Sequence, residues 1–371
     1  MVDSFDLPDG NEKIFADFSK PITNLFGIVL FPVDLYFAAI AGALTLTWAC
    51  LPLWRRWCVR TNLVDDPGHR KIHSKPIPLA GGLAVMTGIL SSLLIGLCIL
   101  WLIERFGGDS SNGSGIRRVL GILDNRMAHP LTYGLGKRGF ELVGILGGAL
   151  GMLLVGWIDD KYELRAGGKF LMQGLIAFMV ALAGVRITLF VPSLAFSYVI
   201  TVLWILTVIN AFNFMDNMNG LCGGLGAIGA WYFAMFAARE GHYLVALIAF
   251  LTFGALLGFL PWNFPEARVF LGDAGSHLVG YLLAVLAILP HFHSTATPRP
   301  WAVVLPLLVL ALPLADMAWV VVLRWRMGKP FYIGDTNHLS HRLARAGLGQ
   351  RLSVLLIWLM ATFFGGLAFW L

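Results

Sequence analysis

Two adjacent carboxylates, Asp159 and Asp160, end an apolar run that begins at Leu142. Neighbouring acids repel each other, and removing them from water at a membrane edge is costly. Such a pair is tolerated where a cation is close, which here is either a basic side chain such as Lys169 or a metal ion. The alternative interpretation is a solvated helix end, and the pair alone does not distinguish the two.

A second polar segment combines an acid with basic residues and a histidine. Asp65 precedes a Pro-Gly turn that leads into Arg70, Lys71 and His73. Basic side chains next to an imidazole bind anions, and the turn residues let the backbone approach a ligand. A basic anchor at the membrane surface is the alternative interpretation.

Asparagine and aspartate recur at every third position of a third segment, as Asn210, Asn213, Asp216 and Asn219. On a helix these side chains form one drifting polar stripe. Oxygen ligands of this kind in an apolar run suit Mg²⁺. Hydrogen bonding between apolar helices is the alternative.

In a fourth segment a single carboxylate, Asp273, lies among glycines where an apolar run begins. It is either a helix cap or a ligand that can approach a metal ion or a phosphate.

The fifth segment starts inside an apolar run and ends in basic residues and histidines. Asp316 lies within the run, and an ionisable residue at such a depth marks function by default. Arg324 follows, and His338, His341 and Arg342 share one helical face at positions i, i+3 and i+4. Packing at the membrane interface is the alternative for the histidine pair.

The composition indicates a membrane protein. Of the 371 residues, 58% are apolar and 13% are charged, whereas a soluble domain has roughly 25% charged residues. The net charge of +6 fits anionic lipid or an anionic substrate better than nucleic acid. The four cysteines lack metal-ligand spacing and are interpreted as core residues.

Apolar runs of a length that spans a bilayer, about 17–25 residues, recur along the chain. We therefore predict an all-α, polytopic membrane protein with about ten transmembrane helices. Residues 32–371 would form one integral-membrane domain, and residues 1–31 a segment at the membrane surface. The predicted spans lie near 32–54, 80–103, 140–158, 170–185, 189–208, 221–238, 243–260, 277–291, 301–323 and 352–371.

Lysine and arginine are more frequent in the odd-numbered connections between these spans than in the even-numbered ones. The positive-inside rule therefore places the odd connections in the cytoplasm. All five polar segments fall on that side. The basic segment 104–139 has the opposite bias, but it is long, and long loops weigh less in the rule.

In this order, the polar segments resemble the motifs of the polyprenyl-phosphate N-acetylhexosamine-1-phosphate transferases, glycosyltransferase family 4. The resemblance extends from about residue 35 to the last span. Asn219 departs from the Asp of many bacterial members, and Ser340 replaces the middle His of a His-x-His-His run. The matching positions are Asp65, Pro67, Arg70, Lys71 and His73; Asp159, Asp160, Leu164 and Lys169; Asn210, Asn213 and Asp216; Phe270 to Ser276; and Asp316, Arg324, Asp335, His338, His341 and Arg342.

The resemblance implies transfer of N-acetylglucosamine-1-phosphate, or a close N-acetylhexosamine-1-phosphate, from a UDP-sugar to a polyprenyl phosphate, with release of UMP. This would be the first membrane step of cell-envelope glycan synthesis, for example of lipopolysaccharide. The resemblance also implies that the reaction requires Mg²⁺, or Mn²⁺ in its place. It further implies a multi-pass protein of the inner (plasma) membrane with its active site on the cytoplasmic face. A homodimer is compatible with it.

Two alternatives remain open. One is a muramyl-pentapeptide-phosphate transferase of peptidoglycan synthesis, although the Arg70-Lys71-x-His73 loop resembles the branch that uses UDP-N-acetylglucosamine more closely. The other, of a different class, is a secondary transporter. Transporters place acids near the membrane midplane on repeated, broken helices, whereas most acids here lie at span ends and no repeat is evident.

The resemblance also assigns roles to residues. Asp273 and Asn213 would bind the metal. Asp159, Asp160, Asp216 and Lys169 would carry out or support catalysis, which joins two anions and so depends on charge neutralisation and positioning. The residues expected to bind substrates are Asp65, Arg70, Lys71, His73, Asn210, Arg324, His338, His341 and Arg342.

Overall fold

The computed structural model describes residues 33–66, 75–106, 125–188, 191, 193–290, 300–330 and 336–371. The predicted surface segment 1–31 and the middle of the basic segment 104–139, residues 107–124, therefore lie outside the described residues. The same is true of the motif residues Pro67, Arg70, Lys71, His73 and Asp335.

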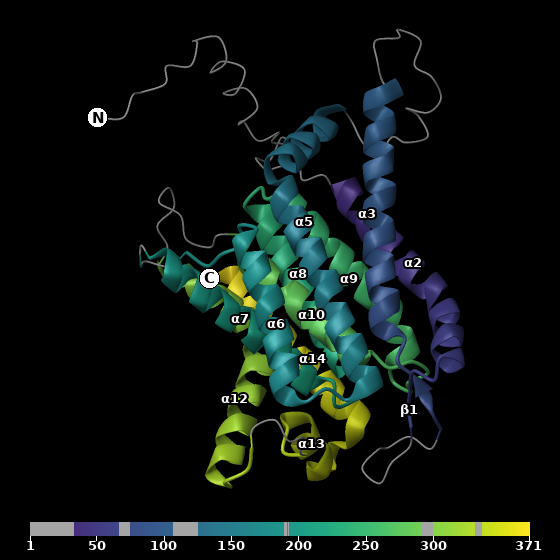
Figure 1. The fold of residues 1–371 in the computed structure, drawn as a ribbon, viewed down its shortest axis with the longest axis vertical. Helices are drawn as coiled ribbons and strands as arrows, with labels where there is room; N and C mark the ends of the chain where they lie inside the picture. Colours follow the sequence, from purple (N-terminus) through teal and green to yellow (C-terminus); the bar gives the residue numbers. More distant parts are fainter. Residues whose placement is uncertain are drawn as a thin grey trace.

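The described part of the chain is almost entirely helical, which confirms the predicted all-α membrane fold (Figure 1). A short antiparallel ribbon pairs β1 (Val64–Asp65) with β2 (Ile77–Pro78). Short helical turns near the C-terminus are η1 (Pro300–Val304), α11 (Leu305–Val309), α13 (Leu339–Leu343) and η2 (Ala344–Leu348). The longer helices are α2 (Val33–Arg60), α3 (Gly81–Phe106), α5 (Asn125–Tyr162), α6 (Ala166–Leu182), α7 (Leu194–Met215), α8 (Leu221–Arg239), α9 (Tyr243–Asn263), α10 (Gly272–Leu286), α12 (Ala311–Arg326) and α14 (Gly349–Trp370).

Fewer helices can span the membrane than the ten that the sequence predicts. Seven described helices are long and apolar enough, or eight if Ala302–Val309 and Ala311–Arg326, which are bent by 74°, form one broken span. Two of the predicted spans, 170–185 and 277–291, correspond to helices that are shorter than a membrane span. These are α6, with 17 residues, and α10, with 15. At 1.5 Å per residue these are about 26 and 22 Å long, less than the roughly 30 Å of a hydrocarbon core.

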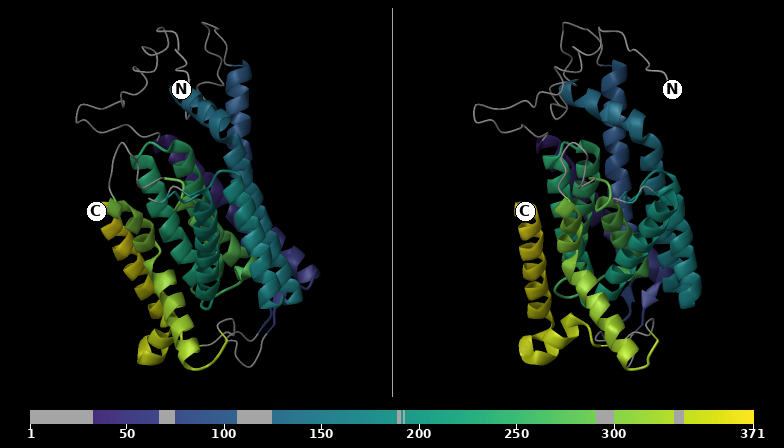
Figure 2. Two further views of the ribbon diagram at one scale, coloured as in Figure 1. Left: turned by 60° about the vertical axis from the view of Figure 1, so that its left-hand side comes forward. Right: turned by 90° about the vertical axis from the view of Figure 1, so that its left-hand side faces the viewer.

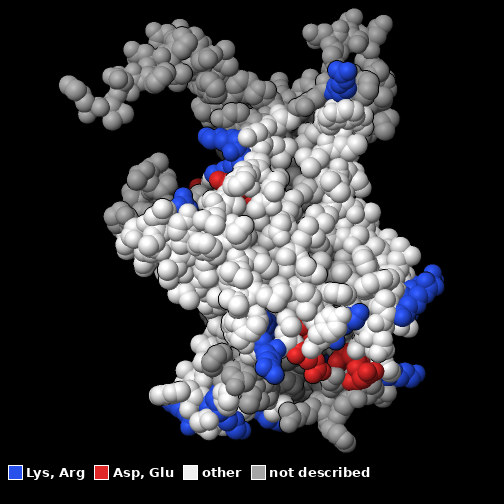
Figure 3. All heavy atoms as spheres, viewed as in Figure 1, with Lys and Arg blue, Asp and Glu red and all other residues white. Residues whose placement is uncertain are grey.

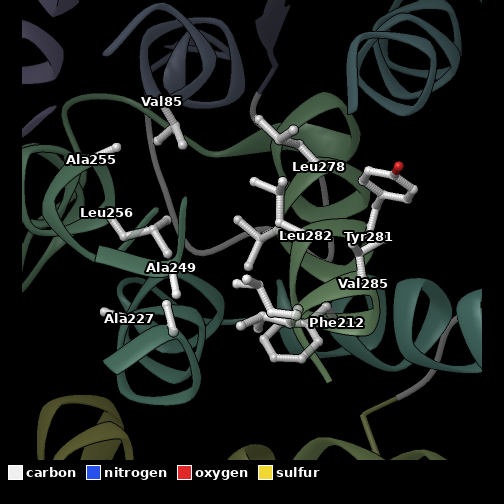
Figure 4. Packing of buried hydrophobic residues seen from close by; sticks show 14 of the residues in the cluster. Val85, Phe212, Ala227, Ala249, Ala255, Leu256, Leu278, Tyr281, Leu282 and Val285 are labelled. Atoms are coloured by element: carbon white, nitrogen blue, oxygen red, sulfur yellow. The ribbon is translucent and has the colours of Figure 1, made fainter. Parts of the chain in front are cut away.

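Helix α10 forms the centre of the bundle. It packs against α3, α5, α7 and α8, and every one of its residues except Asp273 is buried. A helix that is apolar on all sides is expected to be enclosed in this way. Figure 4 shows Leu278, Leu282 and Val285 of α10 among apolar side chains of the neighbouring helices. In both views of Figure 2, α14 lies on the opposite side of the bundle from α3 and α5.

Helix α10 approaches its neighbours backbone to backbone at Gly275 and Gly280. A Cβ added at Gly82 of α3 would lie 2.6 Å from the Cα of Gly275, and one at Gly280 would lie 2.7 Å from the Cα of Ile209 in α7. Small residues permit such close packing of apolar helices, where the hydrophobic effect gives little drive for association. The close contacts fix the start of α10 relative to the ends of α3, α5 and α7.

The contact between α5 and α10 can be tested with a pair of glycine variants. Gly156→Ala is expected to lower thermal stability in detergent, because the new methyl group would overlap the backbone of Asp273 and Ala274. Overpacking of this kind costs about 1–3 kcal/mol. Gly147 on the same helix has open space around it, so Gly147→Ala is the matched control and should change little. Equal midpoints of thermal unfolding for the two variants would contradict the close packing.

Candidate active site

Aspartates from separate parts of the chain converge on one cavity of about 1950 Å³. Asp159 and Asp160 come from the end of α5, Asp216 follows α7, Asp273 begins α10, and Asp65 comes from β1. The β1–β2 ribbon and α13 lie at the same end of the bundle (Figures 1 and 2), and residues of both line the cavity. The structure therefore brings together five acids that are up to 208 positions apart in the sequence (Asp65 to Asp273).

The cavity wall carries charges of both signs. In Figure 3, acidic atoms gather near the lower end of the molecule, with basic atoms on either side of them. Such a mixed wall suits a ligand with several negative charges that binds together with a cation. Besides the five aspartates, the charged lining residues are Asp66, Glu163 and Glu266, with Arg55, Lys75, Arg268, Lys329 and Arg351.

Lys169 supplies the cation that the Asp-Asp pair requires. Its ammonium nitrogen Nζ lies 2.6 Å from Oδ2 of Asp159 and 3.0 Å from Oδ2 of Asp273. The second oxygen of Asp159 accepts a hydrogen bond of 2.8 Å from the backbone N–H of Leu164. One lysine thus joins the ends of α5, α6 and α10. A basic partner, one of the two cations that the sequence left open, is present.

Asp273 is held on both sides and still reaches the cavity. Nδ2 of Asn213 donates to its Oδ1 over 2.6 Å and to Oγ of Ser276 over 3.0 Å. The Asp273 side chain is 33% exposed. Asn213 presents its amide nitrogen to Asp273, so in this arrangement it orients the carboxylate. Sharing a metal ion with Asp273 would require the amide of Asn213 to rotate and present its oxygen.

Asp160 faces the start of α10. Its Oδ1 accepts a hydrogen bond of 2.8 Å from the backbone N–H of Asp273, and its Oδ2 accepts one of 3.0 Å from that of Ala274. Gly272 has a positive φ of 72°, and a Cβ there would lie 2.8 Å from Oδ2 of Asp160. Glycine is therefore required beside this carboxylate.

The acids around the cavity are short of positive charge. The side chain of Asp216 lines the cavity. Loss of water around its carboxylate, and then repulsion by the carboxylates of Asp273, Asp160 and Asp65, raise the pKa of Asp216 well above its ordinary value. A cation that entered the cavity would oppose this shift. Asp159, Asp273 and one imidazole nitrogen of His277 present ligand atoms within 4.8 Å of one another. The Lys169 ammonium bridges the two carboxylates, so a metal ion would bind beside this ammonium or displace it.

The fifth polar segment is anchored from behind the cavity. Oδ2 of the buried Asp316 lies 2.6 Å from Nδ1 of His338, and its Oδ1 accepts a 2.6 Å hydrogen bond from the backbone N–H of Leu339. The ring of Phe214 contacts His338 edge-on at 5.6 Å and lies 5.0 Å from the guanidinium of Arg324. These contacts attach the start of α13 to α12 and to the end of α7.

The residues that the resemblance selects occupy three positions. Asp65, Asp159, Asp160, Asp216, Asp273 and His341 line the cavity. Lys169 and Asn213 contact Asp273 at its wall. The other described residues to which the resemblance assigns a role are absent from the lining. Asn210 lies deeper, Arg324 and His338 are buried, and the Arg342 guanidinium lies 5.1 Å from the ring of Trp319.

A second group of polar side chains, Asn210, Gln173 and His277, is buried deeper than the group around Lys169 and Asp273. The sequence analysis did not identify Gln173 or His277. Nδ2 of Asn210 donates to Oε1 of Gln173 over 3.0 Å, and Nε2 of Gln173 is 3.3 Å from Nε2 of His277. The signal was present, because Gln173 follows Lys169 by four residues and His277 follows Asp273 by four. Residues at this spacing lie one turn apart on the same helical face.

The anchoring role of Asp316 leads to a stability prediction. Asp316→Ala should increase hydrogen exchange in residues 338–343 and lower the unfolding midpoint, because His338 and the Leu339 N–H lose their buried acceptor. Each unsatisfied buried group costs about 1–3 kcal/mol. Arg326→Ala, an exposed change on the same helix, is the control. Exchange in 338–343 that stays at the wild-type rate in Asp316→Ala would contradict the anchor.

Known proteins resemble this chain over most of its length. A family model described as glycosyl transferase family 4 matches residues 142–291. A probable undecaprenyl-phosphate N-acetylglucosaminyl 1-phosphate transferase of Bacillus subtilis is 31% identical over 321 residues, which cover 84% of this chain and 78% of that protein.

Two further relatives come from other bacteria. A decaprenyl-phosphate N-acetylglucosaminephosphotransferase of Mycobacterium tuberculosis is 29% identical over 88% of this chain and 80% of its own length. An undecaprenyl-phosphate alpha-N-acetylglucosaminyl 1-phosphate transferase of Escherichia coli K12 is 27% identical over 83% of this chain and 76% of its own. With this identity and coverage, the chain belongs to glycosyl transferase family 4.

Proposed function

We propose that this protein transfers N-acetylglucosamine-1-phosphate, or a close N-acetylhexosamine-1-phosphate, from a UDP-sugar to a polyprenyl phosphate and releases UMP. The names of its relatives support the lipid acceptor and the sugar. The observation that carries the proposal is the row Asp159–Lys169–Asp273 on the wall of a charged cavity at the ends of apolar helices. A lipid phosphate and a nucleotide sugar can meet there without either leaving its own phase.

In the proposed reaction, an oxygen of the lipid phosphate attacks the phosphorus that carries the sugar. A new phosphorus–oxygen bond forms, and the bond from that phosphorus to the oxygen of UMP breaks. Lys169 attracts the acceptor phosphate, and Asp159, whose Oδ2 lies 2.6 Å from the Lys169 ammonium, accepts the acceptor's proton. Basic residues of the wall, such as Arg55, hold the donor diphosphate.

We further propose that the reaction depends on Mg²⁺, with Mn²⁺ as a substitute. The residues suit such an ion, since Mg²⁺ prefers oxygen ligands and usually takes one or two carboxylates plus substrate phosphates. Asp273 would hold it, with Asp216 and a rotated Asn213 amide beside it. Asp216 lies near the carboxylates of Asp273, Asp160 and Asp65, and this concentration of negative charge supports the need for a cation there. When bound, the ion would neutralise charge on the diphosphate.

The two rival functions have less support. The relatives that match the chain are named as N-acetylglucosamine-phosphate transferases, which does not favour a muramyl-pentapeptide donor. A secondary transporter is not favoured by these names either.

Donor choice gives the direct test of the proposed function. Purified protein with polyprenyl phosphate and Mg²⁺ should release UMP from UDP-N-acetylglucosamine faster than from the muramyl-pentapeptide donor. Other UDP-N-acetylhexosamines and UDP-glucose complete the panel. Faster turnover of the muramyl donor would reverse the assignment, and a lack of UMP release with every UDP-sugar would refute the proposed reaction.

Asp273→Asn tests the proposed metal role. Asn keeps the size of the side chain and removes one charge, so activity should fall at least about a hundredfold, since this corresponds to only about 2.7 kcal/mol of transition-state stabilisation. If Asp273 only caps α10, the change should be mild, because Asn caps a helix about as well as Asp. Transfer rates are measured against Mg²⁺ concentration, with thermal stability as the folding control. A near-normal rate with unchanged Mg²⁺ dependence would refute the metal role.

We also propose that the cavity faces the cytoplasm of a cell whose inner (plasma) membrane holds the protein, since the lysine and arginine bias points that way. Glu163→Cys in a cysteine-free variant should resist an impermeant thiol reagent added to intact cells. Glu240 is an exposed position between α8 and α9, at the end of α8 that is farther from the cavity. Glu240→Cys should therefore react with the reagent. The reverse pattern would invert the orientation.

A further inference from the structure

Asp160 contacts backbone groups of α10, whereas its neighbour Asp159 contacts a side-chain cation. Both oxygens of Asp160 accept backbone N–H groups, those of Asp273 and Ala274, at 2.8 and 3.0 Å. These are the second and third residues of α10, counted from Gly272. A conventional capping side chain accepts from these same two positions. The carboxylate of Asp160 therefore occupies the place of a helix cap.

Helix α10 has no capping side chain of its own. The residue before it is Leu271, which makes no side-chain capping bond, because its side chain has no acceptor. The first N–H groups of a helix need partners from outside the helix, and a buried helix start without them is costly. Asp160, more than a hundred positions earlier in the chain, supplies them. Its negative charge also lies at the positive end of the helix dipole.

The local backbone is shaped around this contact. Gly272 adopts a φ of 72°, and any Cβ there would lie 2.8 Å from Oδ2 of Asp160. At Gly156, one helical turn before Asp160, an added Cβ would overlap the backbone of Asp273. The glycines on both helices thus let the carboxylate reach the two amides.

We infer that Asp160 is a positioning residue that sets the placement of Asp273, and that it neither takes the acceptor's proton nor binds the metal. This inference rests on the proposed function only for what Asp273 does. Because Asp160 holds the N–H of Asp273 itself, it fixes the residue whose side chain meets Lys169 at 3.0 Å and Asn213 at 2.6 Å. The two adjacent acids then have separate tasks, with Asp159 paired to the cation and Asp160 to the helix.

The test compares Asp160→Ala with Asp160→Asn, using measurements that require no substrate. An asparagine oxygen can still accept one of the two N–H groups, whereas alanine accepts none, and Asn caps helices about as well as Asp. We expect Asp160→Ala to increase hydrogen exchange in a peptide that contains residues 272–276, and to weaken Mn²⁺ binding, followed by electron paramagnetic resonance. The weakening should be about tenfold, which equals about 1.4 kcal/mol and is within the measured range for caps. Asp160→Asn should show smaller changes in both.

Glu163→Gln is the charge control, since it removes one exposed negative charge from the same cavity wall without touching α10. It should leave exchange at the start of α10 unchanged. Wild-type exchange and wild-type Mn²⁺ affinity in both Asp160 variants, with loss of sugar-phosphate transfer, would overturn the inference and assign Asp160 to direct chemistry. If Asp160→Ala fails to fold, Asp160→Asn decides alone, because it keeps an acceptor for the helix and removes the carboxylate charge. Transfer within about tenfold of the wild-type rate supports the inference, whereas loss of transfer with wild-type exchange in 272–276 and wild-type Mn²⁺ affinity overturns it.

Failure of the proposed function gives a different result. The wild-type protein would then release no UMP from any donor, whereas hydrogen exchange at the start of α10 would still report on the capping contact.

Discussion

The arrangement of the cavity depends on the burial of like charges beside one ammonium group. Asp159 and Asp273 come from helices that are far apart in sequence, and their carboxylates would repel each other if they were brought together alone. Lys169 lies between them, at 2.6 and 3.0 Å. The breaking of such a partly buried pair is strongly destabilising, because it leaves a charge uncompensated. The ends of α5, α6 and α10 are therefore tied by electrostatics at the place where chemistry is proposed.

The packing of the bundle supports this arrangement. α10 is enclosed by its neighbours, and its start is held against α3 and α5 by contacts that only glycine permits, at Gly82 and Gly156. A shift of α10 by one residue would rotate Asp273 by about 100° away from Lys169 and Asn213. Tight apolar packing and the charged cluster thus specify the same register, which is the kind of agreement that defines a unique fold.

Much of the site follows from the sequence. The need of Asp159 and Asp160 for a cation predicted a partner such as Lys169, and the positions of acids at span ends predicted that they would meet. The number of spans did not follow, because hydropathy does not show that α10 is too short and lies inside the protein. The cap formed by Asp160 could not be predicted from the sequence either. Its partners are backbone N–H groups, which nearly every residue type carries, so no residue type at those positions points to the contact.

Ser340 shows how a departure from a family pattern acquires meaning only in three dimensions. Its hydroxyl donates to Oδ1 of Asn217 over 2.7 Å, and the residue is buried. It therefore joins α13 to the end of α7, a task that no spacing rule in the sequence indicates. The two histidines near Ser340 also have different surroundings, which their spacing in the sequence does not show. His338 contacts the buried Asp316 and is absent from the cavity lining, whereas His341 lines the cavity.

The short length of α6 has a consequence for the lipid around the protein. Leu171, Leu175, Phe178, Met179 and Leu182 expose apolar surface along this helix, yet it is only about 26 Å long. A hydrophobic stretch shorter than the hydrocarbon layer thins the bilayer beside it, at a cost of a fraction of a kcal/mol per Å. A bilayer thinned beside α6 would bring its headgroups closer to Lys169, which lies in the first turn of this helix. A lipid phosphate would then have a shorter distance to travel from the membrane surface to the ammonium, with its hydrocarbon tail still in the membrane.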